Sequence, residues 1–290
     1  MQPITRLGVL VNFTRQGAQE ALGHLLQVAE GAGITLFATP DICERFPGLQ
    51  PSAIDQFIAK GAQGVISLGG DGSLLTAVHT LAGMDLPLIG FNIGHLGYLT
   101  AVNEEGFGRA LEQLASGTYR LEERTTLVAY TDHHPTGTAE ALNDIVIARK
   151  AGGHALAIKV ALDGHPVARY LCDGVILSTP TGSTAYALSV GGPVIAPQAQ
   201  VFLLSVIAPH ALTARPLVIP STTRVTLSID QPNETALLCI DGRDTEEIPS
   251  GHLVEILQAP TPVRLIIPHN KNNPYARLSR KLGWSSSFTR

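Results

Sequence analysis

The residues best suited to chemistry in this sequence are five consecutive small and acidic residues, Gly69-Gly70-Asp71-Gly72-Ser73. They follow an apolar run at 64–68 and precede an apolar segment at 74–78, which predicts a turn between a strand and a helix. Glycines let backbone N–H groups approach a phosphate closely, and the N-terminus of the helix adds partial positive charge. The turn lacks the Gly-Lys-Ser/Thr ending of a Walker A loop and the G-x-G-x-x-G order of a dinucleotide fingerprint. It indicates phosphate chemistry of another kind, although an ordinary βα turn with a solvated Asp71 fits the same residues.

Three further segments place polar residues at the ends of expected strands. Residues 90–99 contain Asn92 among glycines, and Asn143-Asp144 opens an apolar run at 145–148. Residues 173–186 combine an expected strand with a loop of five hydroxyl side chains and the start of a helix. Serine and threonine also serve helix caps and turns, so each segment alone fits a purely structural role.

The elements that must position these residues fall into two groups. Strand-like and helix-like segments alternate over the first hundred residues, which predicts a Rossmann-like α/β domain with a parallel sheet. Asp71 and Asn92 then lie at carboxyl ends of strands, where ligands bind in such sheets. From Thr118 onward β-rich runs, the last at 263–267, predict a mainly β domain, a β-sandwich. We expect an α/β domain at 1–122, a β domain at 123–270, and a helix-like tail, within 271–290, that returns to the first domain.

Composition narrows the class of protein. The chain has 290 residues, of which 44% are hydrophobic and 15% charged, so it can bury one large or two medium cores. A formal net charge of -4 argues against a general nucleic-acid binder. Three widely spaced cysteines favour reduced thiols over disulfides or a zinc cluster. The first residues lack the features of a signal peptide and no apolar run is long enough to cross a bilayer, so we expect a cytoplasmic protein with no membrane partner.

Taken together, the four segments resemble the NAD kinase family over nearly the whole chain. The family pattern is a Gly-Gly-Asp-Gly turn, an Asn-x-Gly-x-x-Gly segment, an Asn-Asp or Asn-Glu pair, and a Thr-Pro-Thr-Gly-Ser-Thr-Ala-Tyr loop followed by Gly-Gly-Pro. These correspond here to residues 69–72, 92–97, 143–144, 179–186 and 191–193. The closing Lys281-Leu282-Gly283-Trp284 is similar to the tail of bacterial members.

The resemblance implies transfer of the γ-phosphoryl group of ATP, as its Mg²⁺ complex, to the 2′-hydroxyl of the adenosine ribose of NAD. Asp71 is the candidate general base; orienting the hydroxyl and helping to hold Mg²⁺ are its alternative roles. Gly69, Gly70 and Gly72 would cradle the triphosphate, and Asn92 would shape the same pocket. No other protein ligand for the metal is expected.

For NAD, the resemblance places Asn143 and Asp144 on adenine and ribose, with hydrogen bonds from Ser183 and Thr184. Tyr186 would stack on a base, although a buried helix tyrosine also fits. Asp173, as an unpaired carboxylate, would face the positive nicotinamide ring, and His154 would lie near it or be a surface histidine. The other residues expected at the site are Ala185, Ala187, Leu188, Ser189 and Arg243.

Some residues depart from the family pattern. Ser73 replaces Thr, Tyr98 replaces Phe, Leu171 stands where some bacterial members have Arg, and Arg243 stands where Gln is frequent. The resemblance also implies a homo-oligomer, either dimer or tetramer. Polyphosphate in place of ATP, and NADH in place of NAD, remain open alternatives. The rival functions are a lipid or sugar kinase, which shares the glycine turn, and a non-catalytic NAD(P)-binding regulator.

Overall fold

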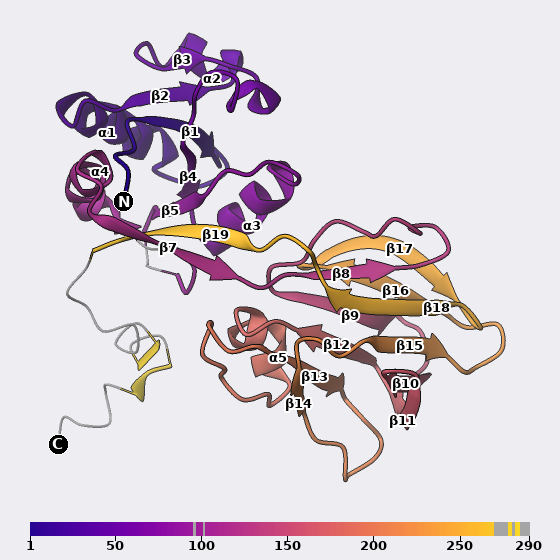
Figure 1. Cartoon of the computed structure of the whole chain (residues 1–290). Helices are drawn as coiled ribbons and strands as arrows, with labels where there is room; N and C mark the ends of the chain where they lie inside the picture. Colours follow the sequence, from indigo (N-terminus) through magenta and orange to yellow (C-terminus); the bar gives the residue numbers. More distant parts are fainter. Residues whose placement is uncertain (95–96, 101, 270–277, 280–281, 285–290) are drawn as a thin grey trace. The chain divides into compact units, whose positions relative to one another are not determined.

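A computed structural model describes residues 1–94, 97–100, 102–269, 278–279 and 282–284 (Figure 1). The chain divides into two compact units. The first contains Met1–Glu122 and the described residues from Arg264 on, and the second contains Glu123–Val263. Most of the helix-like tail expected within 271–290 lies outside the described residues.

The first unit is built on a mostly parallel sheet. The strand order is β3-β2-β1-β4-β5-β19-β7, with β6 also pairing with β5. The strands are β1 (Arg6–Val11), β2 (Thr35–Ala38), β3 (Gln50–Pro51), β4 (Gly64–Gly69), β5 (Leu88–Asn92), β6 (Val102–Asn103), β7 (Tyr119–Arg124) and β19 (Val263–Pro268). Every residue of β4 and β5 is buried, as expected for central strands covered on both faces.

Helices cover this sheet because their apolar residues recur at helical spacing. They are α1 (Ala18–Gly31), α2 (Pro40–Arg45), α3 (Asp71–Thr80) and α4 (Phe107–Ala115), with short 3₁₀ turns η1 (Ile54–Gln56) and η2 (Glu104–Gly106). In α1, Leu22, Leu25 and Ala29 are buried on one stripe. Phe107 of α4 stacks on Phe91 of β5, with ring centroids 4.6 Å apart. These contacts fix the carboxyl ends of the strands, where the glycine turn lies.

Strand β19 differs from the sequence-based assignment, which grouped residues 263–267 with the β domain. It pairs in parallel with β5, Leu265 opposite Leu88, and so belongs to the sheet of the first unit. Its composition resembles that of the preceding strands, and only the long-range pairing reveals where it belongs.

The second unit is a sandwich of two antiparallel sheets, in the orders β11-β10-β15-β18-β8 and β14-β13-β12-β9-β16-β17. Buried residues of both sheets, such as Ile158 of β10 and Leu177 of β12, share one core. The expected fold class, an α/β domain followed by a β-sandwich, is confirmed. The strands are β8 (Leu127–Tyr130), β9 (Asp144–Arg149), β10 (Leu156–Leu162), β11 (His165–Cys172), β12 (Gly174–Ser178), β13 (Val201–Ile207), β14 (Leu217–Pro220), β15 (Val225–Ile229), β16 (Thr235–Ile240), β17 (Arg243–Pro249) and β18 (Leu253–Gln258), with η3 (Gly182–Thr184) and α5 (Tyr186–Ser189) after β12.

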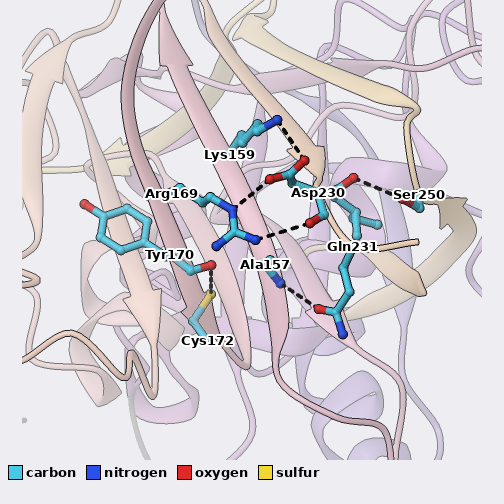
Figure 2. A network of polar contacts seen from close by, with 9 residues as sticks. Ala157, Lys159, Arg169, Tyr170, Cys172, Asp230, Gln231 and Ser250 are labelled. Atoms are coloured by element: carbon cyan, nitrogen blue, oxygen red, sulfur yellow. Dashed lines mark hydrogen bonds and ion pairs between the residues drawn. The ribbon is translucent and has the colours of Figure 1, made fainter. Parts of the chain in front are cut away.

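An exposed ion-pair network sits on the first of these sheets (Figure 2). Lys159 of β10 and Arg169 of β11 lie directly opposite each other, where two like charges would repel. The Asp230 carboxylate bridges them, 2.8 Å from Lys159 Nζ and 2.7 Å from Arg169 Nε. Hydrogen bonds from Lys159 and then Arg169 lower the pKa of Asp230. The Asp230 carboxylate thus offsets the repulsion between the two cations at this edge of the sheet. None of the expected site residues takes part in the network.

Candidate active site

The glycine turn of the first unit joins the end of β4 directly to α3. Gly69 is the last residue of β4 and Asp71 the first residue of α3. A Cβ at Gly69 would overlap the Ser73 hydroxyl. That hydroxyl accepts hydrogen bonds from the Gly70 N–H at 3.3 Å and from Asn12 Nδ2 at 3.3 Å. The Ser73 hydroxyl therefore closes the turn by hydrogen bonding. Serine suffices for this role, although the family pattern has Thr at this position.

The Asp71 carboxylate is held by a short loop at 97–100. Oδ2 accepts the N–H of Tyr98 at 2.7 Å, and Oδ1 accepts the N–H groups of Leu99 at 3.0 Å and Thr100 at 3.1 Å. The Thr100 hydroxyl lies 3.3 Å from Oδ1 and accepts the Gly97 N–H at 3.0 Å. A Cβ at Gly97 would overlap the carboxylate, so this loop requires glycine there. The turn and the Asn-x-Gly-x-x-Gly segment thus form one hydrogen-bonded unit.

These bonds leave the two carboxylate oxygens unequal. Among the described residues, Oδ1 receives three donors, whereas Oδ2 receives only the Tyr98 N–H. Because a carboxylate oxygen has about two lone-pair sites, Oδ2 retains capacity for one more donor or a cation. Burial, and after it the Asp71 charge, raises the pKa of the Tyr98 phenol. Asp71 is therefore both a structural anchor and a group able to act on a substrate.

Asn92 lies at the end of β5 and is buried. Its Nδ2 donates to the Gly94 carbonyl at 3.0 Å, and the following Ile93 N–H donates to the Gly69 carbonyl at 2.8 Å. Asn92 therefore holds the start of the loop that leads to residues 97–100.

In the second unit, a carboxylate that the sequence analysis did not select organises the Asn143-Asp144 pair. Asp241 follows β16 and accepts the N–H groups of Leu142 at 2.9 Å, Asn143 at 2.7 Å and Asp144 at 3.1 Å. Its backbone adopts a positive φ of 49°. The Asp241-Gly242 dipeptide after an apolar strand was the available signal, since Asp and Gly tolerate such turns.

Asp144 is 4% exposed, and its environment opposes ionisation. Burial, and then the charge of Asp241, raises the pKa of Asp144 to about 7, although a hydrogen bond from the Tyr186 backbone N–H lowers it. That hydrogen bond brings Asp144 and Tyr186 together, as their shared role in the sequence analysis requires. The carboxyl group can donate or accept a proton near neutral pH.

The hydroxyl-rich loop packs directly on this pair. Thr179 Oγ1 donates to the Leu142 carbonyl at 2.6 Å, and the Thr179 N–H donates to the Asn143 carbonyl at 2.9 Å. A Cβ at Gly182 would overlap the Asn143 backbone. Ser183 is fully buried, donates to the Pro180 carbonyl at 2.7 Å and accepts the Ile195 N–H at 3.0 Å. The expected ligand hydrogen bond from Ser183 is therefore replaced by a structural role, because its donor is already used within the chain.

Tyr186 is 45% exposed, which removes the alternative of a buried helix tyrosine. Asn143 and Thr184 are half-buried, and Thr184 Oγ1 donates to the Thr181 carbonyl at 3.2 Å. Ala187 is fully buried in an apolar cluster, so its side chain does not face a ligand. Ala185 and Leu188 are half-buried and Ser189 is exposed. The members of this set that combine a polar side-chain group with at least partial exposure are therefore Asn143, Thr184, Tyr186 and Ser189.

Asp173 is not the unpaired carboxylate that the sequence analysis expected. Arg149 Nε lies 2.8 Å from Asp173 Oδ1, and each side chain is about one third exposed, at 34% and 36%. Arg149 Nη1 also donates to the Gly153 carbonyl at 3.1 Å. Arg149 and the exposed His154 line an open cavity of about 340 Å³ with Lys150 and Glu234. Arg243 is exposed at the start of β17, two residues after Asp241.

Metal ligands are sparse in the part of the chain that the structure describes. It contains no group of three or more His, Cys, Asp or Glu side chains placed to hold a metal ion. Its cysteines, Cys43, Cys172 and Cys239, form no disulfide with one another. No helix formed by these residues has the length and apolar character needed to cross a membrane.

Comparison with known proteins assigns the family. Residues 7–119 match the ATP-NAD kinase N-terminal domain, and residues 142–267 match the ATP-NAD kinase C-terminal domain. The chain belongs to the ATP-NAD kinase family. The NAD kinase of Moorella thermoacetica is 34% identical over 262 residues, covering 90% of this chain and 84% of that protein. The NAD kinase of Thiobacillus denitrificans is 32% identical over 290 residues, covering 99% of each.

Two solved structures share the family fold. Yeast NADH kinase complexed with NADH superposes with a TM-score of 0.88 at 23% identity, covering 99% of this chain and 90% of that one. An NAD kinase from Archaeoglobus fulgidus in complex with ATP gives a TM-score of 0.74 at 24% identity, covering 96% and 98%. These likenesses confirm the fold, and the family match makes the chain an NAD kinase, a phosphotransferase, rather than a lipid kinase, a sugar kinase or a non-catalytic regulator.

Proposed function

We propose that this NAD kinase places its phosphoryl donor on the Gly69–Gly72 turn and uses Asp71 at the reacting hydroxyl. In the reaction, the 2′-hydroxyl oxygen of the adenosine ribose of NAD bonds to the γ-phosphorus of ATP. The bond from that phosphorus to the ADP oxygen breaks, and the hydroxyl proton leaves to a base. The observation that carries the assignment is Asp71 itself, a carboxylate at the end of β4 with Oδ2 open to one more partner.

The hydrogen bonds on Asp71 suit positioning as well as proton transfer. Three backbone donors fix the carboxylate plane, so a hydroxyl that binds Oδ2 meets it in one orientation. The N–H groups at the start of α3 face the end of β4, where phosphate oxygens would be stabilised. Positioning and charge neutralisation are the main requirements of phosphoryl transfer.

The residues proposed for NAD are Asn143, Asp144, Thr184 and Tyr186, of which Tyr186 offers an exposed face for a base. Burial raises the pKa of Asp144 to about 7, so both the protonated and the ionised carboxyl group are populated near neutral pH. Either form suits a ribose hydroxyl, because the protonated form can donate a hydrogen bond to it and the ionised form can accept one from it. We retain Asp173 near the nicotinamide half as part of the Arg149–Asp173 pair, with His154 and Arg243 as peripheral contacts.

Mg²⁺ is proposed to arrive with the triphosphate. Such a cation prefers oxygen ligands and is usually held by one or two carboxylates plus substrate phosphates. Asp71 fits this pattern as the alternative to binding the hydroxyl, because it is a single carboxylate whose Oδ2 is only partly used by the described residues. When bound, the cation would neutralise phosphate charge, while the chain would hold the hydroxyl and accept its proton.

The donor, the assembly and the location complete the proposal. We assign ATP as donor, a homo-oligomer, dimer or tetramer, as the working form, and the cytoplasm as the compartment, which three cysteines without a disulfide favour. Size-exclusion chromatography with light scattering would establish the assembly.

The test of the activity is NADP formation by the purified full chain with ATP, Mg²⁺ and NAD, detected with an NADP-specific dehydrogenase. Polyphosphate and NADH run in parallel as alternative donor and acceptor. NADP formed from ATP supports the proposal, and product from polyphosphate alone would reassign the donor. Absence of product with every pair, in protein that binds NAD, would overturn it.

A further inference from the structure

An arginine outside the family motifs lies at the same turn. Arg15 belongs to the connection between β1 and α1, and β1 is the direct neighbour of β4, with Val11 opposite Leu68. Parallel neighbours end at the same edge of a sheet, so this connection and the glycine turn share that edge.

Hydrogen bonds tie the connection to the turn. The Asn12 N–H donates to the Leu68 carbonyl at 3.2 Å, and Asn12 Nδ2 donates to Ser73 Oγ at 3.3 Å. The Arg15 N–H in turn donates to the Asn12 carbonyl at 3.2 Å. Asn12 therefore links the backbone of Arg15 to both sides of the glycine turn.

The Arg15 guanidinium lies against Gly70. A Cβ at Gly70 would sit 2.5 Å from Arg15 Nη2 and 3.0 Å from Cζ, so any larger residue would displace the guanidinium. Gly70 is buried, whereas Arg15 is exposed. Because Gly70 has no Cβ, the Arg15 guanidinium can lie directly against the backbone of the turn.

The positive charge of this guanidinium has no ion-pair partner among the described residues. Within the described ranges, no hydrogen bond or ion pair of the Arg15 side chain is found, and the adjacent Asp71 carboxylate is bound to residues 98–100 instead. A planar guanidinium can bind two phosphate oxygens at once and keeps its charge at any physiological pH. It lies beside N–H groups that would bind the same kind of ligand.

We propose that Arg15 binds the phosphate chain of the donor at the Gly69–Gly72 turn. This rests on the proposed function, because it assigns a further contact to the same donor site. The ligand class is a nucleoside triphosphate or another polyphosphate chain. Arg15 supplies the positive charge that the glycine turn itself lacks.

The experiment measures binding apart from turnover. Full-length wild type, Arg15→Ala and Arg15→Lys are titrated calorimetrically with the β,γ-imido analogue of ATP in the presence of Mg²⁺, and separately with NAD. Arg109→Ala, at another exposed arginine of the first unit, is the matched control. Losing one charge-assisted phosphate contact is expected to raise the Kd for the analogue about tenfold in Arg15→Ala. The Kd for NAD should not change, and Arg15→Lys should fall between wild type and Arg15→Ala.

The outcomes separate this inference from the activity. If wild type forms NADP but Arg15→Ala binds the analogue as wild type does, the inference is overturned while the function stands. If the wild type forms no NADP, the proposed function is refuted, whatever the Kd of the Arg15 variants. If Arg15→Ala does not fold, Arg15→Lys decides: an unchanged Kd for the analogue would refute bidentate binding, and a rise of about threefold would support it.

Discussion

Replacing Asp71 with Asn should damage this enzyme in two measurable ways, because the carboxylate anchors residues 98–100 and is proposed to act on the substrate. Asn has nearly the same volume, but one of its two terminal atoms is a donor. If that NH₂ takes the place of Oδ2, it faces the Tyr98 N–H at the former 2.7 Å contact. If it takes the place of Oδ1, it faces the Leu99 and Thr100 N–H groups, which is worse. The first orientation is therefore the smaller loss.

The size of the structural effect follows from that geometry. One hydrogen bond to a charged acceptor is lost, for about 1.5–3 kcal/mol, and the remaining bonds lose their charge assistance. We therefore expect Asp71→Asn to lower the free energy of unfolding by about 2 kcal/mol. Removal of the proton acceptor should also reduce kcat about 10²–10⁴-fold. NAD binding, assigned to residues of the second unit, should remain largely intact.

Thr100→Val separates the anchor from the chemistry. Valine keeps the shape of this fully buried residue but removes the hydroxyl that lies 3.3 Å from Asp71 Oδ1 and accepts the Gly97 N–H. We expect about 1–2 kcal/mol of destabilisation from the unsatisfied N–H, and a smaller fall in kcat than in Asp71→Asn, with KM for NAD unchanged. Thr100→Ser should recover most of the loss.

Urea denaturation and steady-state NADP formation provide the two measurements. Asp71→Asn with wild-type kcat would remove Asp71 from the mechanism. Asp71→Asn that is inactive but as stable as wild type would refute the anchoring role. If Thr100→Val loses as much kcat as Asp71→Asn, the carboxylate acts mainly through its position.

Three further predictions concern the second unit. Because the pKa of Asp144 rises from 3.8 to about 7 on folding, the folded state binds more protons than the unfolded chain between these values. The free energy of unfolding should therefore fall as pH rises through that window, by up to about 4 kcal/mol, and level off above pH 7; urea denaturation at several pH values should show this slope for wild type and its loss in Asp144→Asn. Tyr186→Ala should weaken NAD binding by about 1–3 kcal/mol, measured by calorimetry, if a base stacks on the exposed ring; an unchanged Kd would count against stacking. Gly182→Ala should destabilise the protein by about 1–3 kcal/mol or more in thermal unfolding, because its Cβ would overlap the Asn143 backbone; wild-type stability would mean that the loop can shift freely.

The sequence was sufficient to predict the elements that lie close together in the chain. The strand expected at 64–68, the helix expected directly after the glycine turn and the change to β strands after Thr118 all follow from local periodicity and turn residues, and the structure has β4 at Gly64–Gly69 and α3 at Asp71–Thr80. It was not sufficient for β19, whose apolar character suits either unit and whose partner β5 lies far back in the chain. Pairing between distant strands depends on the whole fold rather than on local propensity.

The same distinction applies to the site. Asp71 could be selected as a carboxylate between glycines, but its contacts to residues 27 to 29 positions later could not. Asp173 was expected to be unpaired, since its partner Arg149 lies 24 positions earlier, at the end of β9, and nothing near Asp173 in the sequence indicates that ion pair. The resemblance placed Ser183 on a ligand, but its hydroxyl donates to the Pro180 carbonyl instead. A hydroxyl in a loop gives no sign in the sequence that its donor is already used.

The contacts in the structure change the interpretation of the glycines more than that of any other residue type. From sequence, glycines at a βα turn indicate room for a phosphate. In the structure, the missing Cβ at Gly97 makes room for the Asp71 carboxylate, that at Gly70 for the Arg15 guanidinium, and that at Gly182 for the Asn143 backbone. Each of these glycines admits another part of the same chain. Alanine at any of them should therefore displace a group of the proposed site before it obstructs a ligand. At Gly97 and Gly182 the first effect should appear in the stability of the free enzyme, whereas at Gly70 only the end of the exposed Arg15 side chain has to move.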